Sequence, residues 1–431
     1  MAKQIVIIGA GLAGTTAARE LSEHGQAVTV IDPEAGETCE RPPLSKHLFD
    51  DSRYHLPYHL ESTELITFVR DRATSITLAE AAPGSQQTHP SATAEEQPND
   101  AIVGTVALAS GEALDFTHCI LATGMRANRS GIPAYPDALP VYDLSEAEWI
   151  RDKVAAATSQ LNVGVLGSGY LGMEVATSAV AAGHEATVYL RGSEPLRKQL
   201  SAPVRQALVE AHQAAGVNFV TGVSSPDEIP AAVHDLFVTS VGARPVRIPI
   251  DGEMPSPSDD NDFSAAWEVD ATLATAHPGI WAAGDCAHVT DGPFALDHPW
   301  ACEPVAESHG KHLAELILGE PSAEASSTGN STRSWSDVPW HWSFQGPEKV
   351  FTVGLTSPDA DDTIIQYDPS GKKFQVFHFD GGDLSAKLIG VETLNWPPMQ
   401  AAARRVLGGK DIPTRAHFDD PEFDFKVHSR L

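Results

Sequence analysis

The sequence predicts an α/β fold with two Rossmann-like dinucleotide-binding domains, one inserted in the other, plus a C-terminal α+β domain. Three observations predict it. A glycine fingerprint after an apolar run occurs twice, at residues 9–14 (GAGLAG) and 167–172 (GSGYLG). Apolar runs that end in a glycine turn recur between and after these copies. Beyond residue 335 the pattern becomes strand-like, with one helix near the end of the chain.

Each fingerprint has the context that a dinucleotide site requires. In such a motif the first glycine makes the tight turn, the second lets the backbone approach a pyrophosphate, and the third lets helix pack on strand. The first copy follows the apolar run 5–8 and precedes a helical stretch with a glycine stop at Gly25. The second follows residues 163–166 and has its stop at Gly183. The alternative is that both copies are structural turns.

The two copies differ at the position that recognises the adenosine ribose. Asp32, at the end of the strand after the first copy, is suited to bind a ribose diol. The matching residue of the second copy is Leu190, followed by Arg191 and, further on, Arg197. Arginine binds a 2′-phosphate through its planar guanidinium. We therefore expect FAD in the first site and NADPH, in preference to NADH, in the second; otherwise Arg191 is an ordinary solvated cation.

Length, charge and cysteines limit the class of protein. A chain of 431 residues is long enough for about three domains. Its net charge of −29 disfavours nucleic acid and anionic membranes as partners. No apolar run is long enough to span a bilayer, and the first strand begins near residue 4, so we expect a soluble, cytoplasmic protein. The four cysteines form no CxxC pair, which argues against a dithiol–disulfide reductase.

The predicted domain limits follow from these patterns. Residues 1–124 and 246–320 form a discontinuous FAD-binding domain, residues 125–245 an NAD(P)H-binding domain, and residues 335–431 the C-terminal domain. The composition predicts surface loops or linkers at 81–100, 255–262 and 321–334. In the C-terminal domain we expect strands at 350–353, 363–365 and 374–377, and a helix at 400–407.

Taken together, the motifs resemble the two-dinucleotide-fold flavoprotein reductases, which are pyridine nucleotide-disulfide oxidoreductase-like proteins, here without the redox dithiol. The segment 41–46 (RPPLSK) narrows the resemblance to FAD-dependent ferredoxin, rubredoxin and putidaredoxin reductases of the oxygenase-coupled type. The other motifs that carry it are 122–124 (ATG), 283–285 (AGD), Glu174 after the second fingerprint, 339–343 (PWHWS), 395–397 (NWP) and 402–405 (AARR). The resemblance runs nearly end to end.

The resemblance, with the fingerprints, assigns the candidate site residues. Those expected to bind FAD are Gly9, Gly11, Ala13, Gly14, Asp32, Arg41, Lys46, Ala122, Thr123, Gly124, Arg126, Gly284 and Asp285. Those expected to bind NADPH are Gly167, Gly169, Tyr170, Leu171, Gly172, Arg191, Arg197 and Gly242. Three residues are expected to act in catalysis: Lys46, Glu174 and Trp342. No metal site is expected.

The three catalytic candidates have distinct expected roles. Lys46 is suited to hydrogen-bond near flavin N5 and to stabilise negative charge on the reduced ring. Glu174 is expected in the first turn after Gly172, where it pairs with Lys46 and orients the nicotinamide carboxamide. Trp342 is expected beside the isoalloxazine ring. The alternatives are that Glu174 merely stabilises its helix and that Trp342 is part of a core.

Three functions compete. The first is transfer of electrons from NAD(P)H through FAD to a small acidic iron–sulfur carrier of ferredoxin type. The second is an NAD(P)H oxidase or diaphorase that reduces a quinone or another small acceptor, and the third is a redox sensor without turnover. An acidic carrier would be repelled unless basic residues meet it; the candidates are Arg404, Arg405, Lys410, Lys311 and Arg70. A monomer or a homodimer is expected.

At several positions the chain differs from the family's usual motifs, and these differences bear on the identity of the electron acceptor. Family members often carry Asp where this chain has Phe344, and a Glu-x-Trp-x-x-Ala run where it has residues 298–304 (HPWACEP). The tyrosine that usually precedes Arg-Pro-Pro is replaced near Cys39. Lys46 stands where related peroxidases carry a redox cysteine, so cysteine-based peroxide chemistry is not expected.

Overall fold

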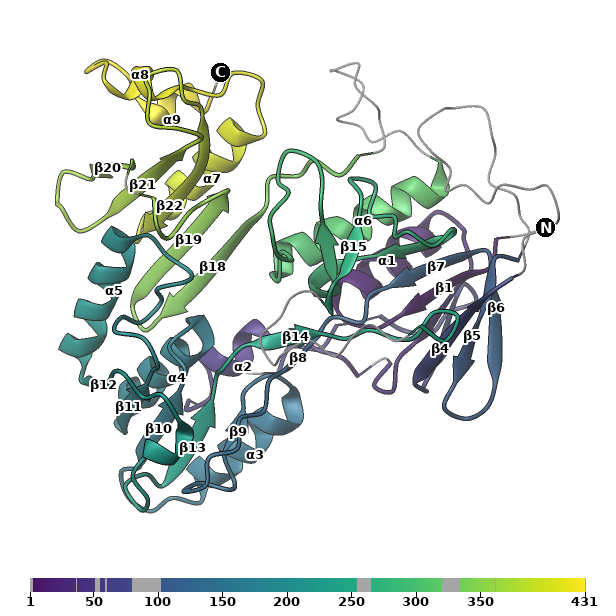
Figure 1. The fold of residues 1–431 in the computed structure, drawn as a ribbon, viewed down its shortest axis with the longest axis horizontal. Coiled ribbons are helices and arrows are strands. Elements are labelled where there is room, and N and C mark those ends of the chain that lie inside the picture. The colour runs from purple at the N-terminus through teal and green to yellow at the C-terminus, as the bar shows by residue number, and fades with distance from the viewer. Residues whose placement is uncertain are drawn as a thin grey trace. The chain divides into compact units, whose positions relative to one another are not determined.

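The computed structural model describes residues 3–35, 37–50, 55–58, 60–79, 102–253, 265–319, 334–360 and 362–430. The loops predicted at 81–100, 255–262 and 321–334 lie outside these residues, apart from Ser334. The chain forms two compact units (Figure 1). The first comprises Met1–Glu40, Pro57–Arg126 and Ala243–Asp337, and the second Arg41–Leu56, Ala127–Gly242 and Val338–Leu431.

A five-stranded parallel sheet lies at the centre of the first unit, in the order β16-β7-β1-β2-β3. Strand β1 of this sheet is buried at all four positions, as expected for a strand covered on both faces. The bounds are β1 Ile5–Ile8, β2 Val28–Ile31, β3 Ile66–Val69, β7 His118–Leu121 and β16 Ile280–Ala282.

Two helices of the first unit, α1 (Leu12–Glu23) and α6 (Glu303–Leu318), lie side by side (Figure 1). Their approach depends on Gly310, because a Cβ there would lie 2.5 Å from the carbonyl oxygen of Ala13. The predicted stop after α1 is confirmed, since Gly25 has a φ of +79°.

The remaining elements of the first unit are small sheets and a turn. An antiparallel sheet contains β4 Ala73–Leu78, β5 Gly104–Leu108 and β6 Ala113–Phe116. The strands β15 Trp267–Val269 and β17 Ala287–Val289 form a pair, and η3 Gly284–Cys286 is a 3-10 turn.

The second unit contains a second parallel sheet with the order β12-β11-β10-β13-β9. Its strands are β9 Leu139–Pro140, β10 Asn162–Leu166, β11 Glu185–Tyr189, β12 Val217–Val220 and β13 Leu236–Thr239. The helices around it are α3 Leu144–Ala155, α4 Tyr170–Ala181 and α5 Ala202–Ala215, and η1 is Pro226–Glu228. The pairing of β10 with β11 and β13 repeats that of β1 with β2 and β7, which confirms the predicted repeat.

The C-terminal part of the second unit is a five-stranded antiparallel sheet in the order β18-β19-β22-β21-β20. The bounds are β18 Trp340–Gln345, β19 Glu348–Gly354, β20 Ile364–Tyr367, β21 Phe374–Phe379, β22 Leu388–Leu394, α7 Pro397–Leu407, α8 Arg415–Phe418 and α9 Phe425–His428. The last predicted helix begins three residues earlier than expected. Prolines 397 and 398 occupy its first turn, where no backbone N–H is needed.

One hydrophobic core joins the second α/β fold to the C-terminal sheet. It includes Val165 and Val188 from the parallel sheet, and Val350 and Val376 from β19 and β21. The short helix α2 (Pro42–Lys46) and the residues after it also contribute, through Leu44, Leu48 and Phe49. The strands β8 (Met125–Ala127) and β14 (Ala243–Pro245) form a separate two-stranded sheet.

The two α/β folds and the C-terminal sheet agree with the predicted fold class. Because the second fold and the C-terminal sheet share one core, the predicted limits of three domains stay a prediction. Among the described helices, none has the length and apolar character needed to cross a bilayer.

Candidate functional site

The first glycine fingerprint forms the turn between β1 and α1. A Cβ at Gly9 would lie 2.1 Å from the carbonyl oxygen of Ala122, and one at Gly14 would lie 2.0 Å from that of Gly9. These two glycines are therefore required by the packing of the protein itself. Around Gly11, in contrast, no atom of the described residues lies within 4 Å of an added Cβ, apart from the glycine and its two chain neighbours. The open space at the middle glycine fits a ligand phosphate close to the backbone.

The second fingerprint repeats this geometry between β10 and α4. A Cβ at Gly167 would lie 2.1 Å from the carbonyl oxygen of Ser240, and one at Gly172 would lie 2.2 Å from that of Gly167. At Gly169 the nearest atom is Nε2 of Gln199 at 3.7 Å, an ordinary contact distance. Both turns therefore leave room at the same place, as two dinucleotide sites require.

Asp32 lies beside the first fingerprint, as predicted. Its Oδ2 accepts a hydrogen bond of 2.9 Å from the Ala10 N–H, and its Oδ1 accepts one of 2.8 Å from the Glu34 N–H. These bonds fix the half-buried carboxylate at the end of β2. Because a carboxylate has about four acceptor positions, the remaining ones are available to a ribose diol.

Two further predicted FAD segments also lie near this turn. Ala122 contacts Gly9 through its carbonyl, while Thr123 donates from Oγ1 to the Val246 carbonyl over 2.5 Å. A Cβ at Gly284 would lie 3.1 Å from the Cβ of Ala13. The structure therefore brings these residues around one turn, with Gly124 and the half-buried Asp285 as their chain neighbours, while Arg126 is exposed.

His309 supports the turn that carries Asp285, and sequence reasoning missed it. The Gly284 N–H donates to Nδ1 of His309 over 3.2 Å. The histidine is fully buried on α6, and burial, together with the nearby His312, lowers its pKa to about 3. It is therefore neutral, as its acceptor role requires. A histidine inside a helix gives no signal of this role in the sequence.

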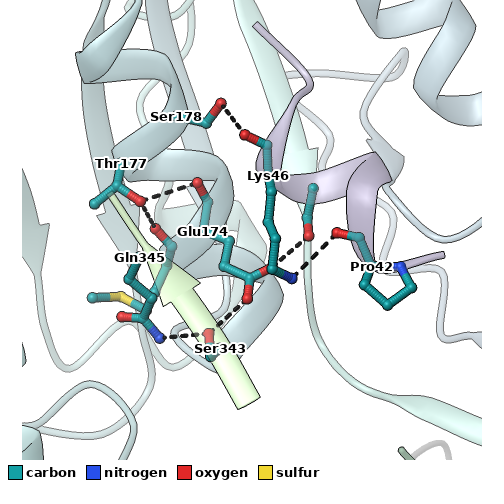
Figure 2. Close-up of polar contacts among 9 residues, drawn as sticks. Pro42, Lys46, Glu174, Thr177, Ser178, Ser343 and Gln345 are labelled. Carbon is teal, nitrogen blue, oxygen red and sulfur yellow. Dashed lines mark hydrogen bonds and ion pairs between the residues drawn. The ribbon is translucent and has the colours of Figure 1, made fainter. Parts of the chain in front are cut away.

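Lys46 and Glu174 form an ion pair, which the sequence analysis predicted. The Nζ of Lys46 lies 3.0 Å from Oε2 of Glu174, and both side chains are largely shielded, at 14% and 2% exposure (Figure 2). Lys46 also donates to the Pro42 carbonyl over 3.2 Å. The two contacts fix the position of the Lys46 side chain, although little water reaches it.

Two serines complete the surroundings of Glu174. The Ser45 hydroxyl donates to Oε2. The Ser343 hydroxyl donates to Oε1 over 2.6 Å (Figure 2). Gln345 in turn donates to Ser343 over 3.1 Å. The carboxylate is thus bound from α2 on one side and from β18 on the other. Neither serine was among the predicted site residues, because they join segments that are far apart in the sequence.

The expected helical position of Glu174 was wrong. The helix α4 begins at Tyr170, one residue after its N-cap Gly169, so Glu174 is its fifth residue and not in the first turn. The free N–H groups of a helix belong to its first four residues. The dipole therefore does not account for Glu174, whereas the lysine and the two serines do.

The other residues near α4 that were expected to bind NADPH differ in burial and in contacts. The hydroxyl of Tyr170 lies 3.1 Å from Nε2 of His341, and burial raises the pKa of this tyrosine. Leu171 is exposed, and Gly242 has a φ of +94°. The carbonyl of Gly242 accepts a hydrogen bond from the Asn128 N–H over 2.9 Å.

Trp342 lies on β18 next to Ser343. Because side chains alternate along a strand, it projects from the face opposite to the one that contacts Glu174. On that face its ring lies 5.4 Å from the ring of Trp340. Arg41, the N-cap of α2, is exposed and packs its guanidinium over the Tyr142 ring at 4.3 Å. The roles of Trp342 and Arg41 toward the flavin stay predictions.

At the ribose end of the second site, the structure agrees with the sequence contrast between Asp32 and Leu190. Leu190, the counterpart of Asp32, is buried with 3% exposure and offers no polar group. Arg191 is exposed. Arg197 is also exposed, but it forms an ion pair with Asp359. Its role in binding a 2′-phosphate stays a prediction.

The cysteines agree with the absence of a redox dithiol. All four lie in the described part of the chain, and none forms a disulfide. Burial raises the pKa of Cys119, of Cys286 and of Cys302, the last to about 12, so these thiols stay protonated. No cluster of histidine, cysteine or carboxylate side chains suited to a metal ion occurs among the described residues.

Comparison with known proteins decides the family. The model described as pyridine nucleotide-disulphide oxidoreductase matches residues 3–309, which is more than half of the chain. The chain belongs to this family. It is an oxidoreductase, and a second model, described as reductase C-terminal, matches residues 340–428. The family that the motifs indicated is thereby confirmed, as is the fold class.

Relatives within the family match nearly the full length of this chain. Rhodocoxin reductase of Rhodococcus erythropolis is 28% identical over 98% of this chain and 93% of its own length. The ferredoxin–NAD(+) reductase component of the p-cumate 2,3-dioxygenase system of Pseudomonas putida is 28% identical, over 93% and 92%. The crystal structure of the ferredoxin reductase for the CYP199A2 system of Rhodopseudomonas palustris superimposes with a TM-score of 0.77 and 25% identity, covering 99% of this chain and all of that one.

Proposed function

We propose that this protein is an FAD-dependent reductase that takes electrons from NAD(P)H and passes them to a small iron–sulfur protein of the ferredoxin type. The observation that carries the proposal is the pair of glycine turns. In each, protein packing explains the outer glycines, while a Cβ on the middle glycine would meet no described atom beyond its chain neighbours closer than 3.7 Å. A chain with two such turns and no cysteine pair fits transfer between two bound dinucleotides.

The residues divide between the two cofactors. Gly11 and Asp32 would hold the pyrophosphate and the ribose of FAD in the first unit. Gly169 and Arg191 would hold those of NADPH in the second unit, with NADH as the alternative donor. Bound FAD would supply the chemistry that couples a two-electron donor to a one-electron acceptor.

Lys46 is proposed as the cation next to the reacting rings. Its ammonium group is fixed by Glu174 and by the Pro42 carbonyl, so its charge is in place before the reaction. Glu174 has its two oxygens occupied by Lys46, Ser45 and Ser343, which prevents it from turning away. Its proposed role is to position Lys46 and the nicotinamide.

The relatives support an iron–sulfur acceptor. The P. putida protein is by name a ferredoxin reductase component of a dioxygenase system, and the R. palustris protein is a ferredoxin reductase for a CYP system. The oxidase or diaphorase alternative is not favoured by these names. That the acceptor is acidic, that the protein is a monomer or homodimer, and that it acts in the cytoplasm remain parts of the proposal.

An acidic acceptor requires basic residues on a chain with a net charge of −29. Two of the candidates are already paired, Arg70 with Glu37 at 2.8 Å and Lys311 with Glu307 at 2.6 Å. Arg404 and Arg405 are exposed on α7 and, among the described residues, neither is paired with a carboxylate. The guanidinium of Arg404 lies 4.7 Å from the centre of the Trp340 ring, and that of Arg405 donates to the Ser429 carbonyl over 3.1 Å. They are the better candidates for the approach of the acceptor.

The test is a spectroscopic titration of the purified protein. We expect a yellow protein whose flavin is bleached by NADPH without oxygen and recovers when an oxidised ferredoxin is added. With ferredoxin, but not with a small dye, the rate should fall steeply as salt is raised, because screening weakens steering between charged surfaces. A colourless protein that takes up no FAD contradicts the proposal. Very slow reduction with a long-lived charge-transfer band would favour the sensor.

A further inference from the structure

The segment 190–201, here called the ribose loop, connects the end of β11 to the helix α5. It is attached to the second fingerprint, because the Leu196 N–H donates to the Ser168 carbonyl over 2.9 Å. Leu196 is buried and has a φ of +57°, a conformation that a leucine adopts only when its surroundings fix it. The ribose loop is therefore a fixed part of the nucleotide site.

The C-terminal sheet holds the end of the ribose loop. The Ser201 N–H donates to Oε1 of Glu392 over 3.0 Å, and Oε2 of the same carboxylate lies 3.1 Å from Nε2 of His378. Glu392 is fully buried on β22. Since Ser201 is the N-cap of α5, a residue of the C-terminal sheet holds the point where the loop ends and this helix begins.

The C-terminal part also contacts the ribose loop at a residue expected to bind NADPH. Asp359, which lies between β19 and β20, forms an ion pair with Arg197. The two side chains are 70% and 50% exposed, so water and ions reach the pair and it can exchange partners. Among the described residues Arg191 forms no such pair, although it belongs to the same loop.

We propose that Asp359 is a specificity-determining residue that lowers the preference for NADPH over NADH. This inference rests on the proposed function, in which the ribose loop receives the adenosine ribose. A 2′-phosphate that binds Arg197 must displace the Asp359 carboxylate or lie next to it, and both outcomes cost free energy because the two groups are anions. A free 2′-hydroxyl carries no charge and meets no such penalty. The C-terminal sheet thus acts on coenzyme choice as well as on structure.

The experiment compares the holoenzyme with the variant Asp359→Asn, using a small dye as acceptor so that ferredoxin binding plays no part. The ratio of kcat/KM for NADPH to that for NADH should rise about 2- to 5-fold, the size expected for an exposed ion pair. Binding of 2′,5′-ADP, measured by calorimetry, should tighten by a similar factor, while binding of 5′-AMP should not change.

Two further variants make the test specific. Asp362→Asn removes the same charge from an exposed residue three positions along the same segment, and the ratio should stay unchanged. In the Arg197→Ala background, Asp359→Asn should have no effect, because the arginine that it releases is gone. An unchanged ratio in Asp359→Asn, or an equal change in Asp362→Asn, overturns the inference while leaving the proposed function intact. Failure of the wild-type protein to bind either nucleotide would overturn both.

Discussion

The hydroxyl of Ser343 donates a 2.6 Å hydrogen bond to the carboxylate of Glu174, across 169 positions of the sequence. The same carboxylate binds Lys46 and Ser45, which come from a segment more than a hundred residues before it. Three parts of the chain are thus joined at one buried charge.

Replacing Glu174 by Gln should slow flavin reduction by NADPH. The change keeps the shape of the side chain but removes the charge that fixes Lys46, so the ammonium group is left partly buried and free to turn away. We expect a rate about 100- to 1,000-fold lower in stopped-flow absorbance, the range found when one charge-stabilising donor is lost. Glu148→Gln, on the exposed side of α3, is the matched control. If both variants reduce at the wild-type rate, Glu174 does not have this role.

Replacing Arg191 by Ala should move coenzyme preference toward NADH. A hydrogen bond to a charged group contributes enough that its loss lowers kcat/KM for NADPH roughly tenfold, with NADH almost unaffected. Steady-state kinetics with both coenzymes and a dye acceptor measure the ratio. A ratio that stays at the wild-type value would mean that Arg191 is an ordinary exposed cation.

Two glycines of the first fingerprint should respond in opposite ways to alanine. The Cβ of Gly11→Ala meets no protein atom within 4 Å, so the fold should persist while FAD retention falls. The Cβ of Gly14→Ala would lie 2.0 Å from the Gly9 carbonyl oxygen, which costs about 2–3 kcal/mol of stability by overpacking. Flavin absorbance and thermal unfolding of both variants separate the two effects. Full flavin content in Gly11→Ala would show that the phosphates do not approach there.

His309 should make the first unit sensitive to acid. Its pKa is lowered to about 3 in the folded state, from a usual value of 6.5, mainly by burial. The unfolded chain therefore binds a proton below about pH 6.5 that the folded chain does not bind until about pH 3. Stability is complete above this range and is lost progressively as pH falls through it.

The measurement is the unfolding temperature between pH 7 and pH 4, in the wild type and in His309→Gln. Glutamine retains an acceptor for the Gly284 N–H but takes up no proton, so the decline with acid should be shallower. It should not vanish, because burial also lowers the pKa of His341, to about 4. Identical slopes in the two proteins would show that His309 is not a source of the acid sensitivity.

Much of the fold could be predicted because its signals are local. The order of apolar strand, spaced glycines and helix is read within about 25 residues, and it located β1, α1, β10 and α4 correctly. The contrast between Asp32 and Leu190 is also local, and the two residues have the exposures that it implies. The pair of Lys46 and Glu174 was predicted only through the resemblance to a family.

What could not be predicted depends on contacts between distant segments. Asp359 carries no pattern of its own, and the motif 339–343 that ends at Ser343 does not reveal the carboxylate that this serine binds; their importance lies in the partner that the fold brings to each. The first-turn position of Glu174 was wrong because the helix start was counted from the last glycine, whereas α4 begins at Tyr170. The core shared with the C-terminal sheet was missed because an apolar strand face does not reveal what covers it.

The place of α2 in the second unit has a consequence for biosynthesis. Residues 41–56 are translated between two segments of the first unit, yet Leu44, Leu48 and Phe49 belong to a core of the second unit whose other members begin at Val141. Their apolar side chains therefore stay uncovered until the helices α3 and α4, which α2 contacts, have also been translated. Nascent or shortened chains should be clients for chaperones that recognise such surfaces.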